Sequence, residues 1–172
     1  EFRIEPEDFA FYEKIKVPPP TWCPECRMIR RMVWRNERAL YHRKDSSSGK
    51  DIVSIYSPEK PFMVYDQKVW WSDVWDPISY GEEYDLSQPF FKQYNALLQR
   101  VPLMALQNIE SVNSDYCSNC SRNKDCYLVS AGFMNERVLY ANRALFCKDS
   151  LDFYLGEKLE LSYGNNNCAQ AF

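Results

Sequence analysis

Apolar residues recur at helical spacing in the first third of the chain. The first such segment follows a short strand expected at residues 2–4 and begins at Pro6, because proline is tolerated in the first turn of a helix. The prolines at 18–20 end this helix and predict an extended approach to the next element. The apolar stripe consists of Phe9, Tyr12 and Ile15.

A second helical pattern begins directly after Cys23 and Cys26 and is predicted to continue to His42. At about 100° per residue, its apolar side chains fall in one arc and its arginines in the opposite arc. The simplest interpretation is a solvated face, with two aromatic rings packed on a neighbouring element. The alternative is a nucleic-acid surface, since guanidinium groups pair with phosphates and rings stack on bases. The candidate residues are Arg27, Arg30, Arg31, Trp34, Arg35 and Arg38.

Short strand patterns and turn residues follow in the middle of the chain. Residues 45–50 form a loop by composition. Two β-runs, at 51–56 and 61–65, flank Pro58, which suits the first central position of a turn. The arrangement predicts a β-hairpin formed by these two runs.

Three tryptophans, at positions 70, 71 and 75, come next. Such a cluster favours a wedge that packs two substructures together, although with Asp73 and Asp76 it would also suit a sugar site. Ser87 is then expected to cap a helix that has Pro89 in its first turn. The predicted buried stripe of this helix is Phe90, Phe91, Tyr94, Leu97, Leu98 and Val101.

Cysteines in the last third of the chain recur at a fixed interval. Cys126, Cys147 and Cys168 are spaced by 21 residues, and short apolar runs alternate with polar corners between them. This pattern is typical of a β-solenoid, so we predict coils of about 21 residues in which each cysteine stacks on the next. Residues 165–168 begin a further coil, whose open edge favours a longer protein or a partner at that end.

Together these patterns predict an α+β protein with three parts. Residues 1–44 form a zinc-finger-like unit with the basic helix, and residues 45–104 contain the hairpin, the Trp-rich loop and a helix. Residues 105–172 form the β-solenoid. Hydrophobic residues make up 45% of the chain and charged residues 26%, a composition that supports a buried core and excludes a disordered polymer.

Charge is distributed unevenly along the chain. The net charge is −3, whereas residues 23–44 contain seven Lys/Arg and two Glu, a net charge of +5. This asymmetry favours an anionic partner such as RNA for that segment alone. No apolar run reaches the ~18 residues of a membrane span, and residues 1–5 show no signal-peptide pattern. We therefore expect a cytoplasmic protein without a membrane partner.

Two Cys-x-x-Cys pairs are candidate zinc ligands, Cys23 with Cys26 and Cys117 with Cys120. Seven cysteines, an odd number, without secretory features favour reduced thiols and a metal over a disulfide framework. A structural zinc ion takes four ligands, so each pair supplies half of a site. His42 is a weaker candidate, because a continuous helix would place it about 24 Å from the first pair.

Several features of residues 1–31 form a recognisable pattern: Phe2, Phe11-Tyr12-Glu13-Lys14, Pro18-Pro19-Pro20, Cys23-Pro24-Glu25-Cys26-Arg27 and Arg30-Arg31. This pattern resembles a probable zinc-binding domain of the treble-clef or zinc-ribbon type found in bacterial proteins. In that family a first Cys-x-x-Cys pair precedes the phenylalanine strand, which would place it before Glu1. Further along, the order Arg-Asn-Glu-Arg, Tyr-Asp-Gln and Trp-Trp-Ser-Asp is similar to long bacterial proteins that continue into Cys- and Tyr-rich repeats.

The resemblance implies zinc as a cofactor and leaves two ligand sets open. Cys23 and Cys26 are completed either by a pair upstream of Glu1 or by Cys117 and Cys120. No activity of the larger family is implied for this chain.

The sequence predicts a non-enzymatic, zinc-binding scaffold whose basic helix contacts nucleic acid. The first alternative is a protein-assembly scaffold with purely structural zinc, in which the solenoid meets another copy or another protein. The second is a β-solenoid that acts on a polysaccharide. A single histidine leaves little for metal hydrolysis or for Ser-His and Cys-His catalysis, and the five scattered glycines form no phosphate loop.

Overall fold

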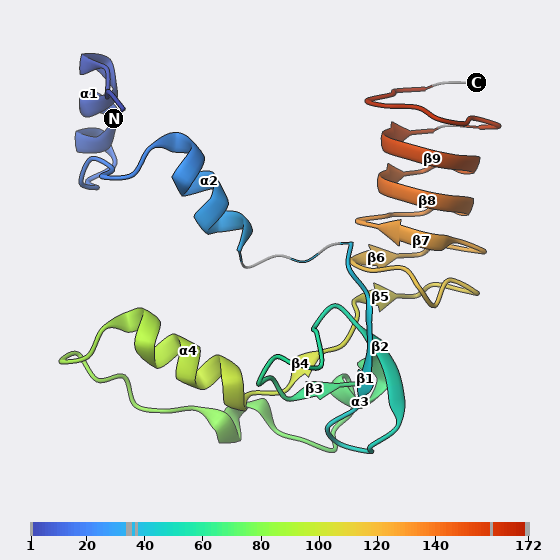
Figure 1. The fold of residues 1–172 in the computed structure, drawn as a ribbon, viewed down its shortest axis with the longest axis horizontal. Helices are drawn as coiled ribbons and strands as arrows, with labels where there is room; N and C mark the ends of the chain where they lie inside the picture. The colour runs from blue at the N-terminus through green and yellow to red at the C-terminus, as the bar shows by residue number, and fades with distance from the viewer. Residues whose placement is uncertain (1, 34–35, 37, 159, 171–172) are drawn as a thin grey trace. The chain divides into compact units, whose positions relative to one another are not determined.

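The structure is a computed structural model that describes residues 2–33, 36, 38–158 and 160–170. The chain divides into two compact units, here called the N-terminal unit (residues 1–36) and the C-terminal unit (residues 37–172). Figure 1 gives the order of their helices and strands. The division between the units precedes residue 44, where the sequence placed the end of the first part.

Both helices of the N-terminal unit begin where the sequence predicts. Helix α1 (Pro6–Lys14) has its proline in the first turn, and helix α2 (Pro24–Met32) is capped by Cys23. Residues 2–5 precede α1 without forming the predicted strand. No residue of α1 or α2 is buried, so this unit has two surface helices and no helix-borne core.

The predicted continuation of the basic helix to His42 is wrong. Residues 41–44 instead form strand β1 (Tyr41–Lys44), which pairs antiparallel with β2 (Asp51–Ser54). The Arg43 guanidinium donates a hydrogen bond to the Phe62 carbonyl oxygen at 2.9 Å. This pairing and the long-range hydrogen bond stabilise an extended backbone in a segment whose periodicity is helical.

Asp45 closes the turn between β1 and β2. Its buried carboxylate accepts hydrogen bonds from the Ser48 backbone N–H at 2.7 Å and from the Asp66 backbone N–H at 3.0 Å. Gly49 completes the turn in the left-handed region, with φ +72°, a conformation that glycine adopts without a steric penalty. The loop predicted at 45–50 is therefore the turn of the observed hairpin.

The predicted hairpin between residues 51–56 and 61–65 is wrong, although its turn exists. The Lys60 backbone N–H donates to the Ser57 carbonyl at 3.1 Å. The following strand β3 (Val64–Tyr65) nevertheless pairs in parallel with β4 (Leu103–Met104). Strand β4, which is remote in sequence, therefore pairs with β3 in place of the predicted partner at 51–56.

Tryptophan rings pack between helix α3 (Gln67–Trp70) and the start of β4. The Trp70 and Trp75 ring centroids are 5.8 Å apart, and the Trp70 indole N–H donates to the Pro102 carbonyl at 3.0 Å. The 3-10 helix η1 (Pro77–Tyr80) follows, and the Trp75 ring also contacts its last residue at 6.1 Å. The cluster packs these local elements together.

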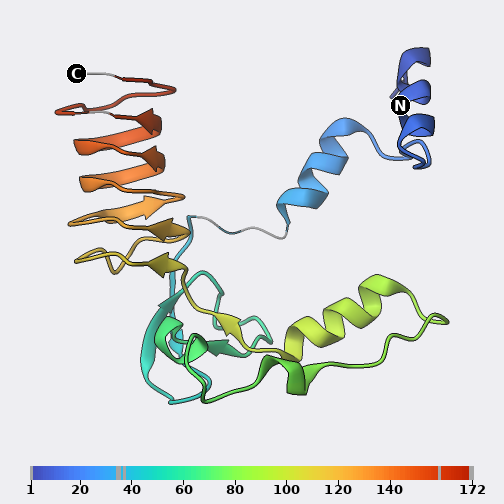
Figure 2. The ribbon, with the colours of Figure 1, turned by 180° about the vertical axis from the view of Figure 1, so that it is seen from behind.

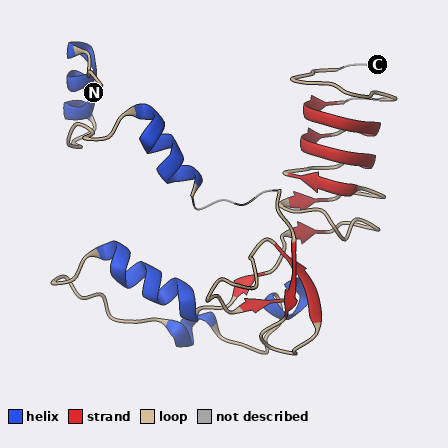
Figure 3. Ribbon diagram, viewed as in Figure 1, coloured by secondary structure: helices blue, strands red, loops and turns tan. Residues whose placement is uncertain are grey.

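Helix α4 (Phe90–Arg100), which Figure 3 shows in blue extending away from the strands of the C-terminal unit, occupies the predicted segment. Its N-cap is Pro89 without a side-chain hydrogen bond, so Ser87 is not the cap. The predicted burial of its apolar stripe is wrong: Phe90 is 55% exposed and Phe91 is 65% exposed.

The last third of the chain is a β-solenoid of parallel strands, stacked one above another in Figure 2. Paired residues are always twelve positions apart, as in Asn108↔Cys120, Tyr127↔Leu139 and Glu136↔Lys148. One coil therefore spans twelve positions, which corrects the longer coil predicted from the cysteine spacing, and the paired strands make about four turns. The strands are β5 (Asn108–Ile109), β6 (Cys120–Ser121), β7 (Tyr127–Ser130), β8 (Glu136–Leu145) and β9 (Lys148–Glu157).

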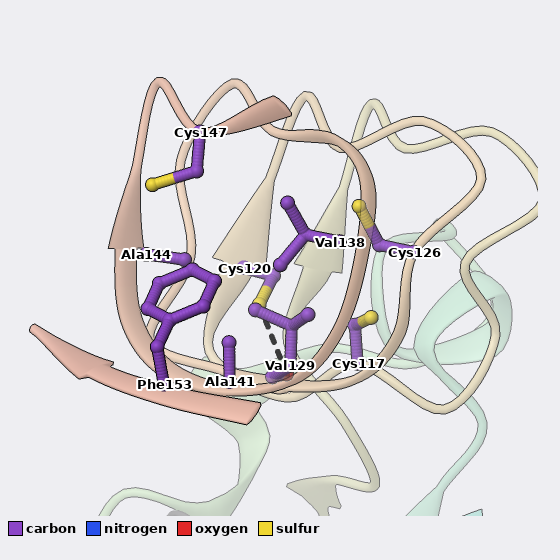
Figure 4. Packing of buried hydrophobic residues seen from close by; sticks show 9 residues of the cluster. All are labelled: Cys117, Cys120, Cys126, Val129, Val138, Ala141, Ala144, Cys147 and Phe153. Carbon is purple, nitrogen blue, oxygen red and sulfur yellow. Dashed lines mark hydrogen bonds between the residues drawn. The ribbon is translucent and has the colours of Figure 1, made fainter. Parts of the chain in front are cut away.

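Every third residue of the solenoid points inward. The buried positions from 114 to 156 include an unbroken series at intervals of three. The residue before each inward position commonly has positive φ, as at Leu128 (51°), Arg137 (53°) and Tyr140 (52°), and this turns the chain at each corner. Figure 4 shows the apolar members of the series converging on the interior: Cys117, Cys120, Cys126, Val129, Val138, Ala141, Ala144, Cys147 and Phe153.

This geometry corrects the predicted stacking of cysteines. The interval from Cys126 to Cys147 is one full coil of twelve positions plus a further nine, so these two residues lie on different sides of the coil. The residue stacked on Asn135 is Cys147, whose backbone N–H donates to the Asn135 side-chain oxygen at 2.9 Å. Asn135 in turn donates to the Asn123 side-chain oxygen at 3.0 Å. A buried amide ladder therefore links successive coils.

Candidate functional site

Cys23 and Cys26 form a compact thiol pair at the start of α2, here called the knuckle. The Cys26 backbone N–H donates a hydrogen bond to Cys23 Sγ at 3.3 Å. This backbone hydrogen bond lowers the pKa of the Cys23 thiol, whereas a side-chain hydrogen bond with Cys23 raises the pKa of the Cys26 thiol. An N–H directed at sulfur at a helix start is an environment that favours a thiolate.

The knuckle fits one half of a zinc site. Two thiolates at this spacing match the ligand type that structural zinc sites use, and such sites take four ligands. Among residues 2–33, 36, 38–158 and 160–170, no group of three or more His, Cys, Asp or Glu side chains gathers where it could hold a metal ion.

The second predicted pair, Cys117 and Cys120, lies in the interior of the solenoid. Cys117 is fully buried, and Cys120 is 3% exposed. Cys120 Sγ donates to the Val129 carbonyl at 3.3 Å, drawn as the dashed line in Figure 4, and lies 3.2 Å from the Ser118 carbonyl. The hydrogen bond to Cys120 and burial raise the pKa of the Cys117 thiol. Both side chains occupy inward positions of the repeat.

The predicted arginine surface does not lie on one helix. Arg27, Arg30 and Arg31 share one face of α2, while Arg38 belongs to the C-terminal unit. Trp34 and Arg35 lie outside the described residues.

The arginine face of α2 includes an aromatic contact that the sequence pattern did not predict. The Arg30 guanidinium lies 5.4 Å from the centre of the Trp22 ring, a distance at which cations and aromatic faces attract. The opposite face of α2 is apolar and also exposed, because Met28, Ile29 and Met32 are 51–55% exposed. Two chemically different surfaces are therefore available on one short helix.

A groove of about 340 Å³ runs along one side of the solenoid and was not predicted. One wall carries Tyr116, Leu128 and Tyr140, which repeat at the interval of one coil. Arg38 lines the groove as well, with its guanidinium 5.7 Å from the centre of the Tyr154 ring. A search for a period of twelve would have detected the first three residues, whereas nothing in the sequence indicates that residue 38 lies beside them.

In comparisons with known proteins, no protein-family model, no curated protein and no solved structure matches this chain. Within the described part of the chain, no helix is both long enough and apolar enough to cross a membrane.

Proposed function

We propose that the chain is a non-enzymatic binding and scaffold protein that holds zinc at its knuckle and presents α2 to nucleic acid. The observation that carries the proposal is the position of the knuckle at the N-terminus of α2, with Cys23 as the cap and the Cys26 N–H directed at its sulfur. A metal held there would fix the start of the helix that bears Arg27, Arg30 and Arg31. Zinc would supply this structural restraint and no chemistry.

The remaining zinc ligands are proposed to come from outside the solenoid. Cys117 and Cys120 already fill inward positions, and their removal from the core would leave a cavity. Exposed Cys26 and half-buried Cys23, in contrast, are accessible to further ligands. This favours the upstream pair implied by the resemblance over the solenoid pair.

Cobalt substitution tests the metal assignment, because thiolate-bound Co²⁺ absorbs light and stands in for Zn²⁺. In a chain that carries the upstream Cys-x-x-Cys pair, we expect the thiolate band to be lost in Cys26→Ser and retained in the double variant Cys117→Ser/Cys120→Ser. Metal analysis after exhaustive dialysis gives the matching zinc content. Retention of the band in Cys26→Ser with loss in the solenoid double variant would transfer the site to the solenoid, and absence of binding to a chain that carries the upstream Cys-x-x-Cys pair would reject it.

Fluorescence anisotropy with a labelled single-stranded RNA tests the nucleic-acid assignment. Binding at low salt should weaken as salt rises, with a log–log slope of about −2 if three arginines each neutralise one phosphate. The triple variant Arg27→Ala/Arg30→Ala/Arg31→Ala should bind at least tenfold more weakly, which corresponds to about 1.4 kcal/mol. A control with the same charge change, Lys60→Ala/Lys68→Ala/Lys92→Ala, uses exposed lysines of the C-terminal unit and should bind as the unaltered chain does.

A second candidate, a protein-assembly scaffold with structural zinc, is favoured by the exposed apolar face of α2. An amphipathic helix without a core to cover commonly packs on another chain. Light scattering of the full chain and of Met28→Lys/Met32→Lys tests this candidate. Concentration-dependent association that the substitutions abolish supports it, whereas a monomer at all concentrations contradicts it.

A further inference from the structure

The solenoid groove combines aromatic and neutral polar side chains in register. Beside one wall, the Tyr127 ring contacts both Tyr116 and Tyr140, at centroid distances of 5.5 and 5.7 Å. Along the other wall, Ser118, Ser130 and Asn142 follow one another at the interval of one coil. Adjacent parallel strands are about 4.8 Å apart, so the polar ladder offers one group at each such step, whereas Tyr116 and Tyr140 are two steps apart with Leu128 between them.

Asn142 carries the strongest sign that the groove takes a ligand. The residue is only 8% exposed and lines the groove. Its side-chain Nδ2 is buried and meets no hydrogen-bond acceptor among the described residues. A buried donor without a partner costs about 1–3 kcal/mol, and such groups are uncommon in folded proteins. Rotation of this side chain toward the groove would allow a ligand oxygen to satisfy the amide.

We infer that this groove is a binding site for a neutral oligosaccharide built from hexose units. A sugar ring presents apolar C–H faces that pack on tyrosine rings and hydroxyl groups that pair with serine and amide side chains, which are the two chemistries of the two walls. The groove volume of about 340 Å³ lies within the roughly 300–1,000 Å³ range of small-molecule sites. The groove is a different surface from the knuckle and α2, so sugar binding there is independent of the proposed function.

The other classes of ligand fit this groove less well. A nucleic-acid strand needs a series of cations along its phosphates, whereas Arg38 is the one cationic residue that lines the groove in the described part of the chain. An extended peptide binds a sheet chiefly through the backbone of an unpaired edge strand. The groove lies on the side of a stack whose strands are already paired, as Ser130↔Asn142 and Asn142↔Tyr154 show.

Preorganisation of the tyrosines also favours the site. The Tyr116–Tyr127 and Tyr127–Tyr140 pairs meet edge to face, at interplanar angles of 69° and 88°. Rings held by neighbours lose little rotamer freedom when a ligand packs on them. Tyr116 and Tyr140 nevertheless remain 42% and 51% exposed, so their rings are available to a ligand.

Isothermal titration and saturation-transfer NMR on the full chain test the inference. The probes are cellohexaose and chitohexaose, with single-stranded RNA and the synthetic peptide of residues 36–41 as competitors of other classes. We expect saturable binding of a hexose oligomer, about tenfold weakened in Tyr140→Ala and in Asn142→Ala. The matched control Tyr163→Ala removes an exposed solenoid tyrosine away from the groove and should bind unchanged.

Circular dichroism first establishes that each variant is folded. Tyr116→Ala replaces Tyr140→Ala if the latter unfolds, because it removes a ring from the same wall. Three results would overturn the inference: no saturable binding of a hexose oligomer, binding that the groove substitutions leave intact, or displacement of the sugar by RNA or the peptide at lower concentration. Loss of RNA binding in the α2 variants with intact sugar binding would support the independence of the two surfaces.

Discussion

Gly132 shows how little space the interior of a solenoid coil leaves. A methyl group added at this position would lie 2.8 Å from the Val129 side chain and 2.9 Å from the Asn135 amide nitrogen. Both neighbours are themselves fully enclosed, so neither has room to move away. Only the absence of a side chain allows the chain to pass between the hydrophobic contact and the amide ladder.

We predict that Gly132→Ala lowers the free energy of unfolding by about 1–3 kcal/mol, the usual cost of overpacking a core. Urea denaturation followed by circular dichroism measures the change. The control Lys148→Ala, at an exposed position of β9, should leave the transition within about 0.5 kcal/mol of the unaltered chain. A Gly132→Ala chain as stable as the control would show that the interior relaxes around the extra methyl group.

The cysteine spacing predicted the burial of these residues but not their stacking. Their predicted burial as small apolar side chains is confirmed for Cys126 and Cys147, which are 3% and 0% exposed. Their predicted stacking is wrong, because the interval of 21 residues between them is not a multiple of the twelve-residue coil. The interval is a multiple of three, so both residues still occupy inward positions. Cysteine is one of several small residues that fit these positions, so its spacing alone could not give the coil length.

At the scale of the elements, the β1–β2 hairpin depends on one buried carboxylate. Burial by itself would raise the pKa of Asp45, but the hydrogen bonds from Ser48 and from backbone N–H groups outweigh it and hold the pKa below its ordinary value. The ionised form is therefore favoured in the folded hairpin. Its contribution to stability is complete above the ordinary pKa of 3.8 and is lost as the pH falls through the lower folded value.

We predict that Asp45→Ala destabilises the chain by about 1–3 kcal/mol at neutral pH, because buried N–H groups lose their acceptor. Hydrogen exchange at the Ser48 amide should accelerate in the variant. In the unaltered chain the same loss of protection should appear only at pH below the ordinary carboxyl range. Asp51→Ala removes an exposed carboxylate that pairs with Lys44 in the same hairpin and should have an effect near zero. Equal effects of the two substitutions would contradict the role assigned to Asp45.

Element positions were more predictable from the sequence than element partners. Proline and cysteine placement indicated the starts of α1 and α2, and the turn at 57–60 was predicted correctly. Local periodicity carries no information about which distant strand pairs with β3, so the β3–β4 pairing could not be anticipated. The groove could not be predicted for the same reason, since Arg38 contacts Tyr154 across more than a hundred residues of sequence.

For the whole molecule, the solenoid class was predictable and its period was not. Alternating short apolar runs and polar corners indicate stacked coils, and the structure confirms the solenoid. The better signal was the series of small residues at every third position, where side chains such as Ser114, Cys117 and Cys120 face inward. Small side chains such as these fill most inward positions, and Val129, Val138 and Phe153 are the larger apolar exceptions.

The period of twelve makes a quantitative prediction about deletions, because each coil of a solenoid contacts only its neighbours. Deletion of residues 132–143 removes one coil and keeps the inward series in register, so Cys147 would then follow Asn123 on the same side. We predict cooperative thermal unfolding by circular dichroism, at a lower temperature than in the unaltered chain. Deletion of residues 132–141 is the control, since it would turn Lys148 and Glu157 inward and should abolish the folded state. If the chain lacking residues 132–141 folded as well as the chain lacking residues 132–143, the period of twelve would not determine which residues face the interior.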